Sequence, residues 1–436
     1  MIRLVLATSL LFGLLCFSAV QAEQLREVPI TETRETLDVK IFPAQGETQQ
    51  RLIWLTNQYG NFRGENTLAH ALTRRGMEVW QVDILESLFL TREDDDIRGL
   101  DGANVAGLIQ QAADEDDVVL AIGGVDRMAV PILRGVRLWQ QQTDDINRLA
   151  GSVLMFPNLY RGTPVAGEDP EFLGIVHATN QPVMILQPQR GVYANRLYTL
   201  REALEAAGSP VFSQNLPDVA DYFFVEIVEE RPDSLEYIYE VTDSAADAEA
   251  FMQLPEQITQ AVTLLQQTPR SETVLEIDPN LTTTIARQTG LVAVEPRKAP
   301  DFDLPGIDGV DYGLDDGFEG VRLVNFWATW CPACVEELPS MERLSQAFDD
   351  DLRMYGIAYQ QSADHLRDFL EDYDVTFPIP VDDDGAVAKE YGAFAFPTSF
   401  LVDHNGMIRY SVNAGIIWDT PEIKQLVQDL VDEQFE

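Results

Sequence analysis

The chain has little cysteine, histidine or positive charge, and each shortage excludes a class of protein. It has 3 cysteines and 4 histidines in 436 residues. No second Cys-x-x-Cys and no Cys/His pair accompanies the one Cys-x-x-Cys present, so a zinc site of that type is excluded. Lysine and arginine number 30 against 72 acidic residues, which gives a net charge of −42. Nucleic acids and anionic lipid surfaces are therefore poor partners. The acid runs 94–96, 349–351 and 382–384 lack calcium-loop spacing, so we expect solvated loops.

Long apolar runs are also scarce. The first one, Leu4–Val20, follows a short charged segment and precedes small residues at the −3 and −1 positions of a cleavage site after Ala22. This pattern predicts a signal peptide over residues 1–22, with export to a bacterial periplasm. No later stretch of 18 apolar residues exists, so we expect no stable membrane insertion after cleavage.

Cleavage removes Cys16 and leaves Cys331 and Cys334 as the cysteines of the mature chain. The residue before Cys16 is Leu15 rather than the small residue of a lipoprotein signal, so lipidation is not expected. A structural disulfide is a weak interpretation of Cys331 and Cys334, because a bridge that closes so short a loop stabilises little.

The Cys-Pro-Ala-Cys run instead predicts a redox-active pair. It follows Leu323–Trp327, an apolar run typical of a strand, and Pro332 suits the first turn of a helix, where the missing N–H costs nothing. Cys331 then lies at a helix N-terminus, where free N–H groups and the helix dipole favour the thiolate. We expect Cys331 to attack disulfides and Cys334 to resolve the mixed disulfide.

Residues 299–436 alternate between strand and helix patterns, which predicts a small α/β domain. The expected strands are 322–327, 352–359, 398–402 and 407–412, and the expected helices are 332–348, 362–373, 386–391 and 421–431.

This stretch, about a third of the chain, resembles the TlpA/DsbE-like thiol–disulfide oxidoreductases of the thioredoxin fold. The matching segments are Ala299–Phe302, Asn325–Cys334, Glu337–Pro339 and Phe396–Thr398. The resemblance implies that Pro397 is cis and faces the disulfide, which exposes the preceding backbone for strand-like pairing with a substrate. Peroxiredoxins share the early Asp-Phe-x-Leu pattern, but this chain lacks their Pro-x-x-x-Thr-x-x-Cys loop.

Two further positions are expected to tune the site. General thioredoxins carry a buried aspartate where this chain has Asn325, as is common in the TlpA-like branch. Glu337 lies three residues after Cys334 on the predicted helix, so both side chains share a face. A partly buried carboxylate there would accept the proton of Cys334 during turnover. The alternative is a solvated surface residue, as we expect for Glu336.

Residues 23–268 also alternate between strands and helices, in a mainly parallel pattern. Their order, and the phrase Leu68–Asp83, resemble an α/β-hydrolase. The expected strands are 37–42, 51–56, 77–83, 118–122, 153–156, 183–186 and 210–213, and the expected helices are 65–75, 195–207 and 245–267.

The catalytic motifs of that family are not matched. After the strand 118–122 the family places a Gly-x-Ser-x-Gly elbow, whereas this chain has Val125 at the serine position and Asp126 next to it. The late loop carries Asp221 where the family often has histidine, and the loop 187–191 lacks the expected acid. His70 and His177 are not placed as a triad base. Without a base a hydroxyl nucleophile stays unactivated and an aspartyl ester is not hydrolysed.

The sequence therefore predicts an α/β protein: a signal peptide (1–22), a non-catalytic α/β-hydrolase-like domain (23–268), a partly structured linker (269–298) and a thioredoxin-like domain (299–436). The expected function is an exported thiol–disulfide oxidoreductase that acts as a reductase on protein thiols and disulfides, without a cofactor or metal. An exported reductase needs a membrane electron donor, because the periplasm is held oxidising. The alternative is a hydrolase or ligand-binding protein with the thioredoxin-like domain as an accessory.

Overall fold

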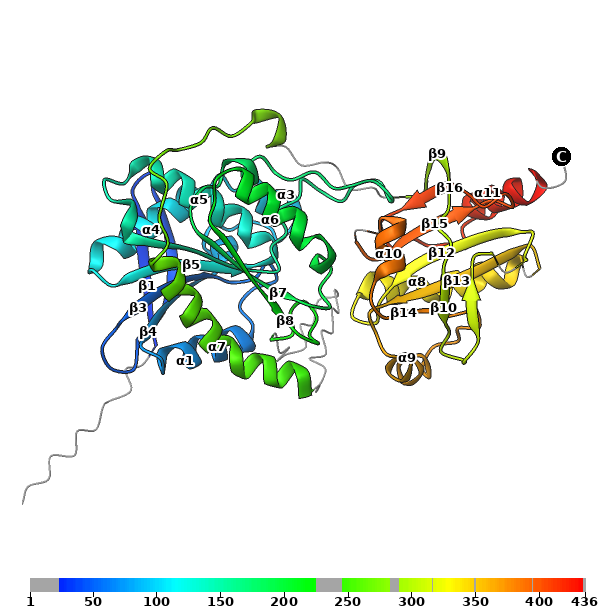
Figure 1. Ribbon diagram of the computed structural model, residues 1–436, viewed down its shortest axis with the longest axis horizontal. Helices are drawn as coiled ribbons and strands as arrows, with labels where there is room; N and C mark the ends of the chain where they lie inside the picture. The colour runs from blue at the N-terminus through cyan, green and yellow to red at the C-terminus, as the bar shows by residue number, and fades with distance from the viewer. Residues whose placement is uncertain are drawn as a thin grey trace, which may run out of the picture.

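The computed structural model describes residues 23–224, 245–282, 290–315, 317–348, 350–393 and 395–433. An eight-stranded sheet forms before residue 217, and a six-stranded sheet forms after residue 291 (Figure 1). The predicted signal peptide, with Cys16, lies outside the described residues. Within the residues described, no helix has the length and apolar character needed to cross a membrane.

The N-terminal part is a sheet with helices on both faces. Its strands are β1 (Gln24–Ile30), β2 (Glu35–Phe42), β3 (Gln50–Leu55), β4 (Met77–Val82), β5 (Val119–Val125), β6 (Leu149–Met155), β7 (Val183–Pro188) and β8 (Val211–Leu216). Its helices are α1 (Arg63–Thr73), α2 (Ile84–Ser87), α3 (Asp94–Gly99), α4 (Ala103–Glu115), α5 (Ala129–Gln142), α6 (Leu197–Ala206) and α7 (Ala245–Gln266).

The first sheet is mixed, with the order β1-β2-β4-β3-β5-β6-β7-β8. β2 is antiparallel to both β1 and β4, and the remaining neighbours are parallel. β3, β6 and β7 are buried along their whole length, which explains their nearly continuous apolar sequences. Helices α3 to α6 pack on one face, and α1 and α7 cover the other (Figure 1).

The C-terminal part is a smaller sheet with the order β14-β13-β12-β15-β16-β9. Its strands are β9 (Val292–Lys298), β12 (Val321–Trp327), β13 (Leu352–Tyr359), β14 (Val381–Asp382), β15 (Thr398–Val402) and β16 (Met407–Val412), and β10 (Asp303–Pro305) pairs separately with β11 (Asp311–Gly313). Its helices are α8 (Pro332–Phe348), α9 (Ala363–Leu370), α10 (Ala386–Tyr391) and α11 (Pro421–Asp432). The predicted strands and helices of this part are confirmed to within a few residues.

The segment between the two sheets is bound to both of them. β9, which the sequence places in the linker, is the edge strand of the second sheet. Residues 273–277 of the same segment form no strand. Their backbone instead accepts hydrogen bonds from side chains of the N-terminal part. Arg137 Nε donates to the carbonyl of Leu275 at 2.7 Å. Asn180 Nδ2 donates to the carbonyl of Thr273 at 2.6 Å.

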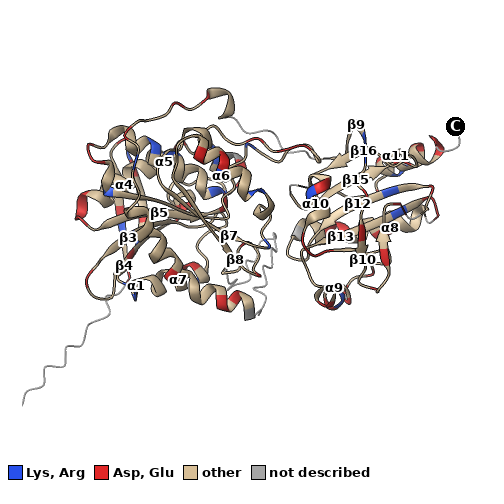
Figure 2. Ribbon diagram, viewed as in Figure 1, with Lys and Arg blue, Asp and Glu red and all other residues tan. Residues whose placement is uncertain are grey.

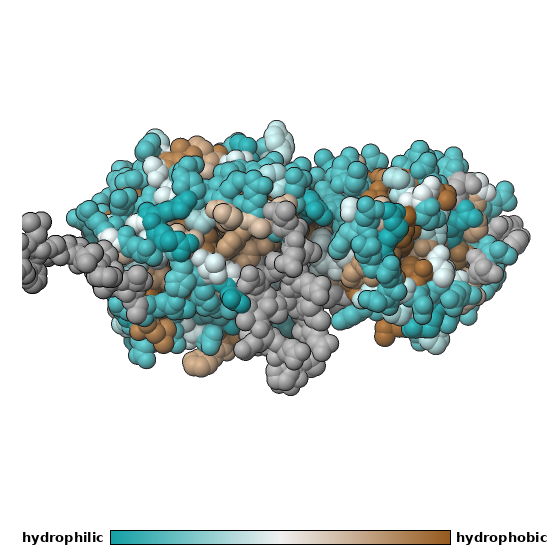
Figure 3. Space-filling model, turned by 90° about the horizontal axis from the view of Figure 1, so that it is seen from below, coloured by the Kyte–Doolittle hydropathy of each residue, from teal (hydrophilic) through white to brown (hydrophobic). Residues whose placement is uncertain are grey.

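Acidic residues are spread over both parts of the molecule (Figure 2), and the face in Figure 3 is largely hydrophilic with separate apolar patches. Two of the acid runs depart from the expectation of solvated loops. Residues 94–96 begin helix α3, where the Asp94 carboxylate pairs with Arg127. In the run 382–384, the first residue belongs to β14. Asp382 is fully buried, and its carboxylate accepts hydrogen bonds from the backbone N–H groups of Val387 and Ala388 at the start of α10. Burial raises the pKa of this carboxyl above its usual range. The run 382–384 therefore begins with a structural residue.

Candidate functional site

The two cysteines lie where β12 passes into α8. Every residue of β12 is buried, and the short loop that follows this strand leads into the start of α8. Cys331 and Cys334 are joined by a disulfide, with Cα atoms 5.3 Å apart. Cys331 is 7% exposed and Cys334 is 0% exposed. The residue immediately before the helix is therefore the more accessible of the pair, which is the arrangement expected of an attacking thiol.

Pro397 comes to the same end of the sheet through strand pairing. β15 is antiparallel to β12, and Thr398 lies opposite Phe326. The residue before Thr398 therefore approaches the loop that carries Cys331. The Phe396–Pro397 peptide is cis, as the resemblance implies. The Phe396 ring packs between aromatic neighbours, with its centroid 4.6 Å from that of Tyr359 and 5.8 Å from that of Trp330.

Glu337 is buried in the first turns of α8, with 3% exposure, and is not a solvated surface residue. Its Oε1 accepts a hydrogen bond from Asn325 Nδ2 at 2.8 Å, and its Oε2 accepts one from Trp418 Nε1 at 3.1 Å. Burial raises the pKa of Glu337 to about 7, and these two donors partly oppose the shift. Glu336 is exposed, as expected. A carboxyl that titrates near neutrality beside a dithiol can take up and release protons under physiological conditions.

Sequence reasoning missed the polar clamp on the loop before Cys331. Gln361 Oε1 accepts a hydrogen bond from the backbone N–H of Thr329 at 2.9 Å, and Gln361 Nε2 donates to Thr329 Oγ1 at 2.5 Å. His365 Nε2 lies 3.0 Å from the same hydroxyl. Gln361 follows β13, whose carboxyl end lies beside that of β12 because the two strands are parallel. The sequence signal that could have pointed to Gln361 was its position just after a buried central strand, where functional residues often lie.

In the N-terminal part, Asp126 occupies the turn after β5. Its φ is +48°, in the left-handed region that non-glycine residues rarely adopt. The side chain is 6% exposed. Its Oδ2 accepts a hydrogen bond from the Tyr222 hydroxyl at 2.7 Å and one from Arg127 Nη1 at 3.3 Å. A strained, buried carboxylate at this turn is held by two donors and has no adjacent base among them.

Asp221 is near enough to Asp126 for the charge of Asp126 to act on it. Its Oδ2 accepts a hydrogen bond from the backbone N–H of Val192 at 2.9 Å, whereas its Oδ1 has no partner within the described part of the chain. Burial raises the pKa of Asp221 to about 7, and the charge of Asp126 adds to this shift. His70 lies on α1 in contact with Glu23, and His177 lies in the short 3-10 helix η3 (Val176–Ala178). The structure therefore brings two carboxyls together at this turn.

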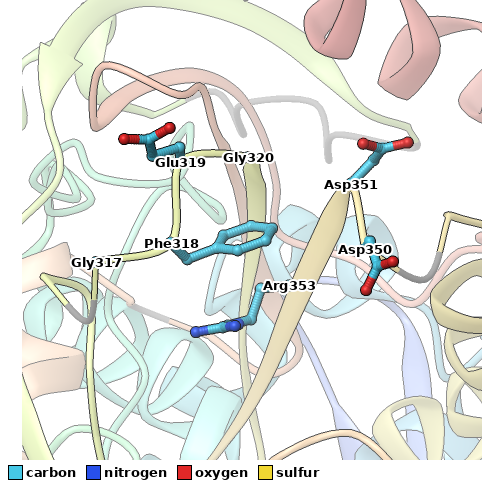
Figure 4. A pocket seen from close by; sticks show the side chains of 7 residues that line it. All are labelled: Gly317, Phe318, Glu319, Gly320, Asp350, Asp351 and Arg353. Atoms are coloured by element: carbon cyan, nitrogen blue, oxygen red, sulfur yellow. The ribbon is translucent and has the colours of Figure 1, made fainter.

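A shallow hollow of about 390 Å³ lies elsewhere, at the opposite edge of the C-terminal sheet (Figure 4). The residues that line it lie where β12 and β13 begin. One of them, Arg353, places its guanidinium 4.4 Å from the centroid of the Phe318 ring. Cys331 follows the other end of β12, so this hollow is no part of the dithiol site. Within the residues that the structure describes, no cluster of three or more His, Cys, Asp or Glu side chains could hold a metal ion.

Comparison with known proteins concerns the part that carries the disulfide. The model of the AhpC/TSA family, which is thioredoxin-like, matches residues 296–411. The thioredoxin-like protein YneN of Bacillus subtilis is 36% identical over 118 residues, which are 26% of this chain and 69% of that protein.

The chain is also similar to a second curated relative and to a solved structure. The thiol-disulfide oxidoreductase ResA of Bacillus thuringiensis is 32% identical over 114 residues, which are 26% of this chain and 65% of ResA, so the chain spans somewhat less than two thirds of that relative. Among solved structures, a putative thiol:disulfide interchange protein DsbE from Chlorobium tepidum is 25% identical, with coverage of 33% of this chain and 100% of that one and a TM-score of 0.29.

Proposed function

The chain belongs, through its C-terminal part, to the thioredoxin-like thiol–disulfide oxidoreductases, and we propose that it exchanges disulfides with partner proteins through Cys331 and Cys334. The observation that carries the proposal is the Cys331–Cys334 disulfide at the head of α8, with the cis-Pro397 loop brought to the same end of the sheet. A cysteine at a helix N-terminus is the one whose thiolate is favoured. The cis-proline leaves the backbone before it open to pair with an extended partner.

In the proposed reaction, the Cys331 thiolate attacks one sulfur of the partner disulfide. A bond forms between Cys331 and the partner, and the second partner sulfur leaves as a thiolate that takes up a proton. Cys334 then loses its proton and attacks Cys331, which releases the first partner thiol. The partner gains two electrons and Cys331–Cys334 becomes the disulfide.

Glu337 is the proposed acceptor of the Cys334 proton. The support is its burial in the turn of α8 after Cys334 and its pKa of about 7, which burial raises. Asn325 and Trp418 hold the carboxyl in place through the hydrogen bonds described above. Proton transfer by a positioned side chain is most effective when its pKa lies near the working pH.

We propose that the protein works as a reductase after export, with residues 1–22 removed. Each turnover leaves Cys331–Cys334 oxidised, so a reductant of the dithiol class must restore it. In an oxidising compartment that reductant has to draw electrons across the membrane, which makes a membrane-bound dithiol donor the expected partner. No further cofactor is required for this exchange.

The N-terminal part, residues 23–268, is proposed to be a hydrolase-like domain without hydrolase activity. The run of parallel strands and the strained turn at Asp126, between β5 and the helix that follows, support this architecture. The Asp126 carboxylate, the candidate nucleophile, is already engaged by Tyr222 and Arg127, and Asp221 takes the place where the hydrolase resemblance has histidine. The alternative is a hydrolase that uses Asp126, and assays of ester hydrolysis and halide release decide between the two.

An insulin-reduction assay tests the dithiol function directly. The full-length protein should reduce insulin disulfides in the presence of excess dithiothreitol, and Cys331→Ser should abolish the acceleration. Glu336→Gln, which alters an exposed neighbour of the site, serves as the control and should retain the wild-type rate. A wild-type rate in Cys331→Ser would show that Cys331 takes no part in the reaction.

A further inference from the structure

Residues 160–172 of the N-terminal part form an arm that contacts the C-terminal part, which carries Cys331 and Cys334. The base of the arm is the antiparallel bridge between Tyr160 and Phe172. Its tip extends to the C-terminal part near α10 and β16 (Figure 1). Ala166 at the tip is 4% exposed and belongs to an apolar cluster of the second sheet that also contains Tyr391 and Phe400. The arm is therefore anchored in the core of the other part.

The arm tip contacts the two segments that flank Pro397. The backbone N–H of Gly167 donates to the carbonyl of Gly392 at 3.3 Å, at the start of the loop that leads to Pro397. The carbonyl of Pro164 accepts a hydrogen bond from the Asn413 side chain. That same Asn413 accepts a hydrogen bond from the Thr398 hydroxyl at 2.5 Å, one residue after Pro397.

A second contact is made by residues 189–196, the loop after β7. Arg190 Nε donates to the carbonyl of Gln360 at 3.0 Å, and Asn195 Nδ2 lies 3.5 Å from the Tyr359 hydroxyl. The Tyr359 ring packs on Phe396, the residue of the cis peptide. The next residue after Gln360 is Gln361, which clamps the loop before Cys331. Asp221 is also near enough for its charge to raise the pKa of Tyr359, which is already raised by burial.

The side of the dithiol site formed by the cis-proline loop therefore faces the N-terminal part. Ala395, next to Phe396, packs against the apolar core of the first sheet. The three segments contacted, around residues 359–361, 392–395 and 413, all border the loop of Pro397 or the loop of Cys331. A partner that pairs with the backbone before Pro397 has to enter beside the arm and the 189–196 loop.

We propose that these two segments of the N-terminal part form one wall of the partner-binding site and restrict it to small or extended disulfides. This inference rests on the proposed dithiol function and adds to it the class of substrate. A compact protein needs several residues on each side of its disulfide to approach the site, and the wall occupies that space. A small aromatic disulfide or an unfolded segment needs only the strip along the cis peptide. Arg190 and Asn195 are specificity-determining residues that hold the wall in place.

The test compares two substrates in full-length variants. The substrates are a compact disulfide protein, native ribonuclease A, and a small one, 5,5′-dithiobis(2-nitrobenzoate). The double variant Arg190→Ala/Asn195→Ala should raise kcat/KM for the compact protein about tenfold, because the loss of two contacts shifts the wall toward open positions. Its kcat/KM for the small disulfide should stay within about twofold of wild type. The matched control is Arg201→Ala, on α6, which pairs with Glu205 and leaves the wall intact.

An arm variant tests the same idea without Arg190 and Asn195. Ala166 is 4% exposed in the apolar cluster of the second sheet, so Ala166→Asp should displace the arm, because an unpaired carboxylate is costly to bury there. Ala206 on α6 is exposed, so Ala206→Asp introduces the same charge without that burial. Ala166→Asp should give the same change in substrate ratio and Ala206→Asp should give none.

Two outcomes would contradict the proposed wall. Unchanged substrate ratios in both wall variants would show that the contacts do not restrict access. A parallel fall for both substrates would show that the N-terminal part only positions the dithiol loops. Failure of the dithiol function itself would appear differently, as a wild-type protein that does not react with the small disulfide.

Discussion

The Asn325 side-chain amide donates a hydrogen bond of 2.8 Å to the Glu337 carboxyl, which joins the buried strand β12 to the helix that carries the cysteines. Trp418 Nε1 donates to the other oxygen of the same carboxyl at 3.1 Å. An asparagine can supply this N–H, whereas an ionised aspartate at position 325 could only accept and would repel Glu337. The presence of Asn325 and the burial of Glu337 are therefore parts of one arrangement.

Glu337→Gln should slow disulfide exchange by about a hundredfold at pH 8, because a positioned proton acceptor typically contributes that much or more. The pKa of Glu337 is raised to about 7, so the wild-type carboxyl accepts a proton only as the pH rises through 7. Stopped-flow measurement between pH 5 and 9 should show a rate increase around pH 7 that the variant lacks. Glu336→Gln is the matched control. Identical pH profiles for all three proteins would leave Glu337 without a role in proton transfer.

Cys331 should react first with iodoacetamide when the reduced protein is alkylated at neutral pH. It is the more exposed thiol and lies at the N-terminus of α8, where the thiolate is favoured. Peptide mass spectrometry after short labelling should find most of the label on Cys331. In addition, Cys334→Ser should accumulate mixed disulfides with partner proteins, whereas Cys331→Ser should not. Preferential labelling of Cys334 would reverse the two roles.

The full-length protein should not hydrolyse short acyl esters or haloalkanes. The Asp126 carboxylate already accepts hydrogen bonds from Tyr222 and Arg127, and His70 and His177 lie elsewhere, on α1 and in η3. A chromogenic ester assay and a halide-release assay should give the same low rates for wild type and Asp126→Asn. Turnover that disappears in Asp126→Asn, but persists in Cys331→Ser, would instead make this a protein with two activities.

Asp221→Asn should stabilise the protein at pH 8 more than at pH 5. The pKa of Asp221 is about 7 in the folded protein against 3.8 for an ordinary aspartate, so the folded state binds more protons than the unfolded state between these values. The free energy of unfolding of the wild type therefore falls as the pH rises from about 4 to 7, and asparagine removes this loss.

Thermal unfolding at the two pH values measures this effect. The control is Asp218→Asn, an exposed residue of the same loop with φ +57°, a conformation that asparagine tolerates. The melting temperature of Asp218→Asn should follow that of the wild type at both pH values. An equal effect of Asp221→Asn at pH 5 and pH 8 would contradict the raised pKa.

Local sequence patterns were enough to predict the elements around the dithiol. The apolar run of β12 and the proline after Cys331 predicted the strand and the helix, because both depend on neighbours a few residues away. Glu337 could be placed on the same helix face as Cys334 by spacing alone. Its burial could not be predicted, since that depends on Trp418, which the chain brings back 81 residues later.

The sequence by itself determined the strands and helices next to Cys331 and Cys334, β12 and α8 among them, because hydrophobic periodicity and helix-end chemistry are local properties. It did not indicate β1, α3, α4 or α5 in the N-terminal part. Only the tertiary structure decided that β9 completes the second sheet, that Gln361 clamps the loop before Cys331, and that the arm of residues 160–172 lies beside the Pro397 loop. Each of these is a contact between segments far apart in the chain, and such contacts are selected by packing and hydrogen-bond geometry that no single segment encodes.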